Sequence, residues 1–340
     1  MNERELLIRL IHGPASGAEL ARHCGQTRAA LWKRIDALRT AGVAIGAQPG
    51  RGYLLQRPLE LLDADLIRAA LPAPLRGGVA ALEVAWSLDS TNSELLRRQT
   101  PATGAAVLLA ERQTGGRGRR GRDWTSPLAA NLYLSLARMF SGGLARLPGL
   151  SLVAGVASAE ALQALGFGAV RLKWPNDLVV ADGDGLRKLG GLLVEGGGEH
   201  AGPVRAVLGL GLNIDMPPAF AAAIAQPWID LATLAGGMRA GSMHAGSKRA
   251  CAPPSRNQVA ATLLAHWLPA LEQFDVHGLA PFLPRYAQLD ALAGRDVALH
   301  GEGTTRAGQA IGIAADGALR VRVDGIEHHV HSGEISVRAT

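Results

Sequence analysis

Residues 115–124 read Gly-Gly-Arg-Gly-Arg-Arg-Gly-Arg-Asp-Trp, and the rest of the chain is organised around this segment. Its four glycines let backbone N–H groups approach an anion closely, and its four arginines present fork-shaped donors that match carboxylate and phosphate. Gly/Arg runs also occur in disordered segments that bind RNA. Here the run is short and lies between two strand-like stretches, 107–111 and 131–136, which favours an ordered loop that grips a charged ligand.

The composition of the 340 residues is that of a globular protein with two or three domains. Hydrophobic residues make up 48% and charged residues 19%, and no apolar run has membrane-spanning length. The N-terminus lacks the pattern of a signal peptide, and Cys24 and Cys251 have no metal-ligand spacing. We therefore expect a cytoplasmic protein with no membrane contact and no structural zinc.

The first 58 residues carry most of the positive charge, with nine Lys and Arg against four Asp and Glu, a net +5 of the chain's +6. Helical stretches near Leu6, at 16–24 and at 28–39 precede a hairpin at 45–54 with a basic tip. This order is typical of a winged helix-turn-helix, although a three-helix unit that only packs on the remainder is an alternative. The expected DNA contacts are Gln26, Thr27, Arg28 and Lys33 in a major groove, and Arg51 on the backbone or in a minor groove.

Together with this N-terminal segment, the residues after position 58 predict an α+β multidomain chain. We expect a linker at 59–83, a central α/β domain with a mixed sheet at 84–290, and a small SH3-like β-barrel at 291–340. Within the central domain, Thr91 and Glu94 form a capping box that opens a helix, and 150–165 forms a buried helix. Strands are expected at 170–174, 178–180, 188–195 and 207–213.

Two familiar kinds of site are excluded. The glycines of the 207–213 strand do not match the dinucleotide-binding GxGxxG pattern, and the chain has no Walker sequence, so any nucleotide is held by something else. His328, His329 and His331 do not form a metal site, because neighbours on a strand point to opposite faces. Residues 236–257 contain four basic residues and no acidic one, and we expect a mobile loop there.

Several motifs occur in one order along nearly the whole chain, after the winged helix. They are Ser90-Thr91-Asn92, the 115–124 loop with Ser126-Pro127, Lys173-Trp174-Pro175-Asn176-Asp177-Leu178, Lys188 with Gly190-Gly191, and Gly209-Leu210-Gly211-Leu212-Asn213. In this order they resemble the bacterial family of bifunctional biotin–protein ligases and biotin operon repressors. The 115–124 loop and the Lys-Trp-Pro-Asn-Asp-Leu string are the most specific parts of the resemblance.

The resemblance implies a set of site residues. Biotin would contact Ser90, Thr91, Asn92, Gln113, Gly116, Arg117, Gly118, Arg119, Lys188 and Gly190. ATP would be held by Arg119, Arg120, Arg122, Lys173, Asn176, Asn213 and Trp228. Lys188 and Arg119 would be catalytic, and Trp124 and Leu132 would give the apolar surroundings that suit the biotin ring and its valeryl chain.

The reaction implied by the resemblance has two steps. Biotin carboxylate attacks the α-phosphate of MgATP to give biotinyl-5′-adenylate and pyrophosphate, and a lysine of the biotin carboxyl carrier protein of acetyl-CoA carboxylase then takes the biotinyl group. Lys188, Arg119 and Mg²⁺ would neutralise charge that grows on the phosphoryl oxygens. A glycine-rich loop that closes would protect the water-sensitive adenylate.

The resemblance also implies regulation. The adenylate acts as corepressor in the family by promoting a homodimer that places two winged helices on a palindromic operator. Two segments look longer than the family pattern, the 182–185 turn and the 236–257 loop. The alternatives are a lipoate–protein ligase and a biotin-sensing DNA-binding regulator without ligase activity.

Overall fold

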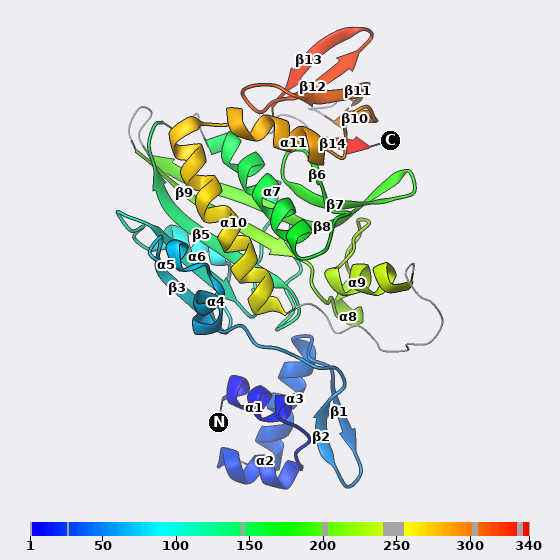
Figure 1. Cartoon of the computed structure of the whole chain (residues 1–340). Helices are drawn as coiled ribbons and strands as arrows, with labels where there is room; N and C mark the ends of the chain where they lie inside the picture. Colours follow the sequence, from blue (N-terminus) through cyan, green and yellow to red (C-terminus); the bar gives the residue numbers. More distant parts are fainter. Residues whose placement is uncertain are drawn as a thin grey trace.

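The structure is a computed structural model and describes residues 2–25, 27–143, 147–198, 203–240, 255–300, 305–331 and 336–339. Three parts follow one another along the molecule in Figure 1: a helical N-terminal domain, a central domain built on a seven-stranded sheet, and a C-terminal five-stranded sheet. The two termini lie at opposite ends (Figure 1). Within the described ranges, no helix is long and apolar enough to cross a membrane.

The N-terminal domain is a winged helix-turn-helix, as the sequence predicts. Ser16 and Thr27 cap the two helices of the turn by accepting hydrogen bonds from Glu19 N and Ala30 N. The wing hairpin is extended by Ala15, whose backbone pairs with Tyr53. The elements are α1 Glu3–Ile11, α2 Gly17–Cys24, α3 Arg28–Thr40, β1 Ile45–Gln48 and β2 Gly52–Leu55.

The central sheet is mixed, also as predicted. Its strand order is β3-β4-β5-β9-β8-β7-β6, and β3 runs parallel to β4 while all other neighbours are antiparallel. The strands are β3 Val79–Ala85, β4 Ala105–Ala110, β5 Leu132–Phe140, β6 Arg171–Lys173, β7 Asp177–Asp182, β8 Gly185–Gly198 and β9 Val204–Leu212.

The two faces of this sheet have different surroundings. The even-numbered leucines 132, 134 and 136 of β5 and 208, 210 and 212 of β9 join the main core with helices α7 Leu147–Ala164 and α10 Arg256–His277, which cover one face in Figure 1. Helix α6 Thr91–Arg97 packs on the opposite face against β5, β9 and β4. Because side chains alternate along a strand, the odd-numbered residues of β5 and β9 face the side of α6.

The segment 59–83 is folded into the central domain, so the expectation of a linker is wrong there. It contains α4 Ala64–Ala70, α5 Ala73–Arg76 and most of strand β3 at the sheet edge. Leu62, Ile67 and Leu71 are buried in the main core, and α4 packs on α10. Pro72 and Pro74 suggest a linker, but burial of the leucines and isoleucine that precede them outweighs that signal.

The C-terminal part is an antiparallel sheet of order β13-β12-β11-β10-β14. Its closure into an SH3-like barrel stays a prediction. Strand β13 carries His328 and His329, and His329 Nε2 lies 3.1 Å from Glu327 Oε1. In the part of the chain that the structure describes, no group of three or more His, Cys, Asp or Glu side chains could hold a metal ion. The strands are β10 Asp296–His300, β11 Thr305–Ile313, β12 Leu319–Val323, β13 Ile326–Val330 and β14 Ser336–Ala339.

The expectation of a loop over 236–257 is wrong at its two ends, because residues 236–240 belong to a helix and Arg256 and Asn257 begin α10. Residues 241–254 of that loop, with Cys251, lie outside the described residues. The remaining helices are α8 Pro218–Ala221, α9 Leu231–Ala240 and α11 Leu283–Leu289.

A buried ion pair joins distant parts of the central domain. Arg256 Nη2 at the start of α10 lies 2.7 Å from Glu111 Oε2 at the end of β4, and both side chains are almost fully buried. Glu111 Oε1 also accepts from Leu62 N at 2.5 Å, and Arg256 Nη1 donates to Asn131 O at 3.2 Å. These bonds satisfy both charges and fix the chain segment that leads from the N-terminal domain.

The N-terminal domain shares its core with the central domain. Leu128 and Ala129 of the central domain are buried among the apolar side chains of α1 to α3, and Leu128 N donates to Ala41 O at 2.8 Å. Arg57 Nη1 pairs with Asp215 Oδ1 at 2.9 Å. The winged helix is therefore packed directly on the central domain.

The buried pair gives a stability prediction. Glu111→Gln keeps the side-chain shape but leaves the Arg256 charge buried without a counterion, so the free energy of unfolding should fall by about 3–5 kcal/mol. Glu160→Gln is the matched control, because Glu160 pairs with Arg285 on a partly exposed surface and its loss should cost under about 1 kcal/mol. Denaturant unfolding followed by circular dichroism measures both, and equal losses would contradict the special role of the buried pair.

Candidate active site

A cleft of about 840 Å³ lies on the α6 side of the central sheet. Its walls come from the start of α6, the 115–124 loop, the β6–β7 turn, strands β8 and β9, and the segment 223–227. Of the predicted site residues, those that line it are Ser90, Thr91, Asn92, Gln113, Arg117, Gly118, Arg119, Arg120, Arg122, Trp124, Lys173, Asn176 and Lys188. The fold thus collects motifs that are far apart in the sequence.

The start of α6 forms a rigid polar corner of the cleft. Ser90, not Thr91, is the N-cap, and its side chain accepts from Ser93 N, so the predicted capping box is wrong by one residue. Thr91 N and Oγ1 both donate to Gln113 Oε1, at 2.9 and 3.2 Å. The helix therefore begins one residue earlier and leaves the Thr91 hydroxyl turned toward the neighbouring loop.

Asn92 is held on three sides. Its Nδ2 donates to Leu193 O at 3.1 Å and to Glu195 Oε2 at 2.9 Å, and its Oδ1 accepts from Ser135 Oγ at 2.6 Å. A Cβ added to Gly209 would lie only 2.2 Å from Asn92 Oδ1. The glycine on the cleft side of β9 is thus what allows Asn92 to occupy this position.

The 115–124 loop is ordered in the structure. Gly118 N donates to Arg122 O at 2.6 Å and Trp124 N donates to Gly116 O at 2.9 Å, which folds the loop back on itself. A Cβ on Gly116 would lie 2.7 Å from Ser126 Oγ and from Trp124 O, so this position admits only glycine. This geometry supports the gripping loop over a disordered RNA-binding segment.

The loop brings its arginines to different partners. Arg117 Nη2 donates to Ser93 Oγ at 2.8 Å and lies 3.2 Å from Glu195 Oε1. Arg119 Nη1 donates to Asn176 Oδ1 at 3.3 Å. Burial, then the charges of Arg120 and Arg122, lowers the pKa of Arg119 from its usual value, although a guanidinium stays protonated at neutral pH.

Lys188 lies beside an acid and an aromatic ring. Its Nζ is 2.8 Å from Asp177 Oδ1 and 5.4 Å from the centroid of the Trp124 ring. The Lys188 backbone pairs with the segment around Trp228, through Lys188 N to Pro227 O and Ile229 N to Lys188 O. Lys188 is therefore fixed at both its backbone and its ammonium group.

The cleft as a whole is positively charged. Two carboxylates, those of Asp123 and Asp177, are among the side chains that line it. Against them stand six cations: Arg117, Arg119, Arg120, Arg122, Lys173 and Lys188. Such an excess of cations in a recessed site favours anionic ligands.

Some predicted site residues do not line the cleft. Gly116 and Gly190 are packed behind it, and a Cβ on Gly190 would lie 2.9 Å from Gly211 O. Asn213 is buried and donates through Nδ2 to Ile229 O at 3.1 Å. Trp228 is half-buried beside Lys188, and Leu132 is fully buried in the main core, where its even-numbered position places it. These residues support the lining residues rather than forming the surface.

Other residues were missed by the sequence analysis. Asp177 lines the cleft and pairs with Lys188, and Glu195 holds Asn92. The two-residue period of β8 from Gly191 through Leu193 to Glu195 was the available signal. Trp174 also lines the cleft, and its Nε1 donates to Gly317 O of the C-terminal part at 3.0 Å, a contact that local sequence cannot reveal.

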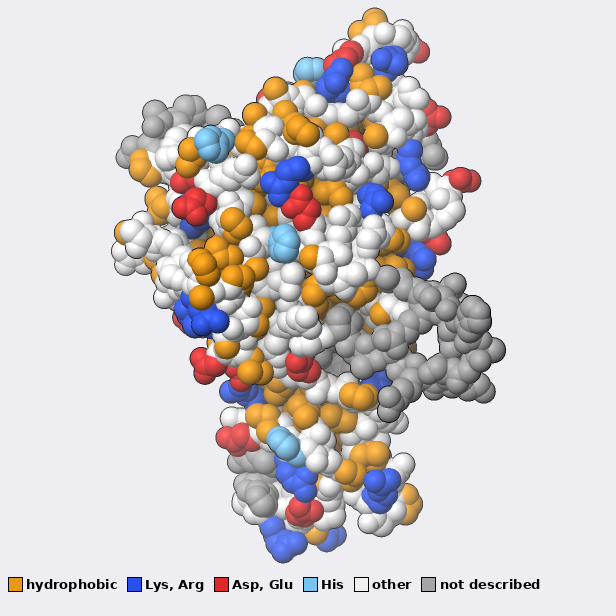
Figure 2. All heavy atoms as spheres, viewed as in Figure 1, with side chains coloured by type: hydrophobic (Ala, Val, Ile, Leu, Met, Phe, Trp, Pro, Cys, Tyr) orange, Lys and Arg blue, Asp and Glu red, His pale blue; other side chains and the backbone are white. Residues whose placement is uncertain are grey.

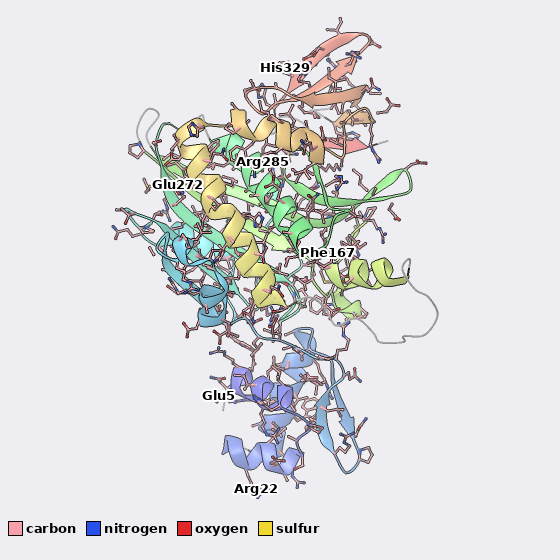
Figure 3. The ribbon with its side chains drawn as sticks, in the orientation of Figure 1. Glu5, Arg22, Phe167, Glu272, Arg285 and His329 are labelled. Atoms are coloured by element: carbon pink, nitrogen blue, oxygen red, sulfur yellow. The ribbon has the colours of Figure 1, made fainter. Side chains whose placement is uncertain are left out.

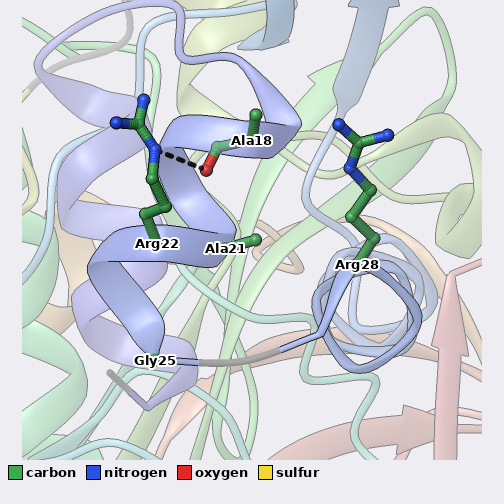
Figure 4. A pocket seen from close by; sticks show the side chains of 5 residues that line it. All are labelled: Ala18, Ala21, Arg22, Gly25 and Arg28. Atoms are coloured by element: carbon green, nitrogen blue, oxygen red, sulfur yellow. Dashed lines mark hydrogen bonds between the residues drawn. The ribbon is translucent and has the colours of Figure 1, made fainter.

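The expected DNA-binding residues lie together on the N-terminal domain. Thr27, Arg28 and Lys33 are exposed at the start of α3, and Arg51 is exposed at the tip of the wing. Gln26 lies outside the described residues. Arg22 of α2 and Arg28 of α3 project to the same side of a groove floored by Ala18 and Ala21, and Arg22 Nε donates to Ala18 O at 3.4 Å (Figure 4).

Three family models match successive parts of the chain. They are an HTH domain over residues 2–54, the biotin/lipoate A/B protein ligase family over 84–213, and a biotin protein ligase C-terminal domain over 293–338. The bifunctional ligase/repressor BirA of Escherichia coli strain K12 is 40% identical over 324 residues, covering 95% of this chain and 93% of that protein. The chain belongs to the BirA family of biotin–protein ligases.

Other members and relatives agree with this assignment. The BirA protein of Salmonella typhimurium is also 40% identical over the same share of both chains, and the biotin–[acetyl-CoA-carboxylase] ligase of Paracoccus denitrificans is 31% identical, covering 69% of this chain and 91% of that protein. A solved biotin protein ligase of Aquifex aeolicus has a TM-score of 0.60 at 24% identity and covers 77% of this chain and 100% of that chain, which shows the same fold.

The Asn92 contact gives a prediction for this BirA-family enzyme. Gly209→Ala should displace Asn92 and lower the biotinylation rate at least tenfold without unfolding the protein, because its Cβ would overlap the Asn92 amide. Gly197→Ala is the control, since no atom lies within 4 Å of its added Cβ. Incorporation of labelled biotin into a carrier domain measures both variants, and an unchanged rate for Gly209→Ala would show that Asn92 is not needed in this position.

Proposed function

We propose that the chain activates biotin with ATP to biotinyl-5′-AMP and transfers biotin to a lysine of the biotin carboxyl carrier protein of acetyl-CoA carboxylase. The observation that carries this proposal is the excess of cations in a cleft that also has a rigid polar corner at α6. The names of two related proteins support the proposed acceptor and substrates. The Paracoccus relative is named as a ligase for acetyl-CoA carboxylase, and the Aquifex structure contains biotin and ATP.

The geometry suggests where each substrate binds. Ser90, Thr91 and Asn92, with Gln113, supply neutral donors and acceptors that suit the ureido group of biotin. The biotin carboxylate then extends toward Lys188 and Arg119. The triphosphate occupies the part of the cleft lined by Arg120, Arg122, Lys173 and Asn176.

The first step joins two anions. A biotin carboxylate oxygen attacks the α-phosphorus, the bond from that phosphorus to the bridging oxygen of the β-phosphate breaks, and pyrophosphate leaves with the bonding electrons. Lys188 and Arg119 reduce the repulsion between the reactants and stabilise the charge that grows on the α-phosphate oxygens. In the second step a carrier lysine amine attacks the biotinyl carbonyl and AMP leaves.

Mg²⁺ fits the residues present. Magnesium prefers oxygen ligands and is usually bound by one or two carboxylates together with substrate phosphates. Asp123 and Asp177 line the cleft, and Asp177 would exchange part of its contact with Lys188 for the ion. When bound, Mg²⁺ would neutralise phosphate charge and help pyrophosphate to leave.

The winged helix supports a second proposed function, repression of a biotin operon with biotinyl-5′-AMP as corepressor and a homodimer as the DNA-binding form. Figure 2 shows Lys and Arg side chains gathered over the N-terminal domain, and Figure 3 places Arg22 at its outer end, away from His329 on the C-terminal sheet. Operator DNA and a metabolic carrier protein as partners would place this protein in the cytoplasm.

The ligase proposal is tested by the mass of an apo biotin carrier domain after incubation with MgATP and either biotin or lipoate. A biotinyl shift in the first tube alone is expected. Lys188→Ala should lower the rate of that shift by about 10²–10³-fold, because one preorganised cation is lost. Arg187→Ala is the control, since Arg187 pairs with Asp182 instead.

Three other results would contradict the proposal. A shift with lipoate alone would assign the chain to lipoate ligation. Bound biotin without any transfer would favour a sensor that lacks ligase activity. An unchanged rate for Lys188→Ala would remove the role of that lysine.

DNA binding gives a separate prediction. Arg28→Ala should weaken binding to the operator about tenfold and reduce its salt dependence, while biotinylation continues at the rate of the unmodified chain. Fluorescence anisotropy over a range of salt concentrations measures the change. Arg320→Ala on the C-terminal sheet is the control, and equal operator affinity for Arg28→Ala and the unmodified chain would remove Arg28 from the interface.

A further inference from the structure

Trp32 of helix α3 is an exposed aromatic residue in a strongly charged surface. Its relative exposure is 55%, whereas Leu31 and Ile35 on the same helix are buried in the N-terminal core. An exposed tryptophan on a small helical domain loses apolar burial, so its position is informative.

The neighbours of Trp32 form one continuous face. Arg28 and Asp36 are one helical turn before and after it on α3, and Lys33 is the next residue, all exposed. Across the groove of Figure 4, Arg22 of α2 projects to the same side as Arg28. Arg28 and Lys33 therefore flank Trp32 along α3, and Arg22 lies across the groove on the side of Arg28.

The chemistry of the indole limits what it can recognise. Arg22, Arg28 and Lys33 can bind phosphates and base acceptors, whereas Trp32 has one N–H donor, no acceptor and a broad apolar surface. In the major groove, the 5-methyl group of thymine is the feature that an apolar side chain recognises. We propose that Trp32 is a specificity-determining residue that contacts the methyl group of one thymine in each operator half-site.

This inference rests on the proposed DNA binding. It adds the residue that reads the sequence, Trp32, and the base that it reads, a thymine. The charged residues would set position and affinity, because phosphate contacts carry no sequence information. Trp32 would add preference for thymine over cytosine at one base pair. A protein partner on this face would instead make Trp32 matter without any dependence on the DNA sequence.

The test begins with an operator selected from a random duplex library by the full chain in the presence of biotin and MgATP. Each thymine of that operator is replaced in turn by deoxyuridine, which removes only the methyl group. At one position in each half-site the unmodified chain should lose about fourfold or more in affinity, as expected for burial of one methyl group.

Variants assign the effect to the side chain. Trp32→Ala should bind the thymine operator more weakly and show no further loss with deoxyuridine at that position. Arg28→Ala should bind more weakly on every operator but keep the deoxyuridine penalty. The biotinylation rate of Trp32→Ala should equal that of the unmodified chain, which shows that the exposed substitution leaves the protein folded.

The possible failures are distinct. If the chain selects no DNA, the proposed DNA binding fails and this inference fails with it. If an operator is bound but no thymine shows a methyl penalty, DNA binding stands and the role of Trp32 is wrong. A penalty that persists in Trp32→Ala would also overturn the inference, because another residue would then read the methyl group. The scan with the unmodified chain can overturn the inference even if a variant is unstable, because it needs no substitution in the protein.

Discussion

The two-residue period of strand β9 is the constraint on which the rest of the central domain depends. Its even-numbered leucines point into the core beneath α7 and α10, and its odd-numbered glycines, Gly209 and Gly211, face the cleft. Asn92 and Trp124 lie where side chains on those glycines would otherwise be. One strand therefore contributes apolar side chains to the core on one face and leaves space for the cleft on the other.

Charged residues likewise have two separate roles, one in the core and one in the cleft. The buried pair of Glu111 and Arg256 neutralises itself and has a structural role. The cleft, by contrast, has more cations than carboxylates, and its cations are held by neutral groups such as Ser93 and Asn176 as well as by acids. Burial, then repulsion from Arg120 and Arg122, lowers the pKa of Arg119. Binding of an anionic substrate would relieve that repulsion.

The sequence predicts the secondary structure and many cleft-lining residues well, but it predicts the long-range packing behind the cleft less well. Caps, periodicity and turn residues identify the winged helix and most strands, and the Gly/Arg loop and the Lys-Trp-Pro-Asn-Asp-Leu string give many of the residues that line the cleft. Asn213 and Gly190 were expected on the surface of the site but are buried behind it, because burial depends on strands that are distant in sequence. The hydrogen bond from Trp174 to Gly317 and the folded 59–83 segment are likewise set by long-range packing.

The placement of Leu128 and Ala129 among the helices of the N-terminal domain has a consequence for how this chain can be divided. These residues follow the 115–124 loop closely in sequence, yet they are buried in the core of the winged helix. A cut near residue 58 would expose apolar surface on both pieces, since Leu128 and Ala129 would remain on the second piece while the apolar side chains around them would belong to the first. The boundary between the two activities in sequence is therefore not a boundary between two independent folding units.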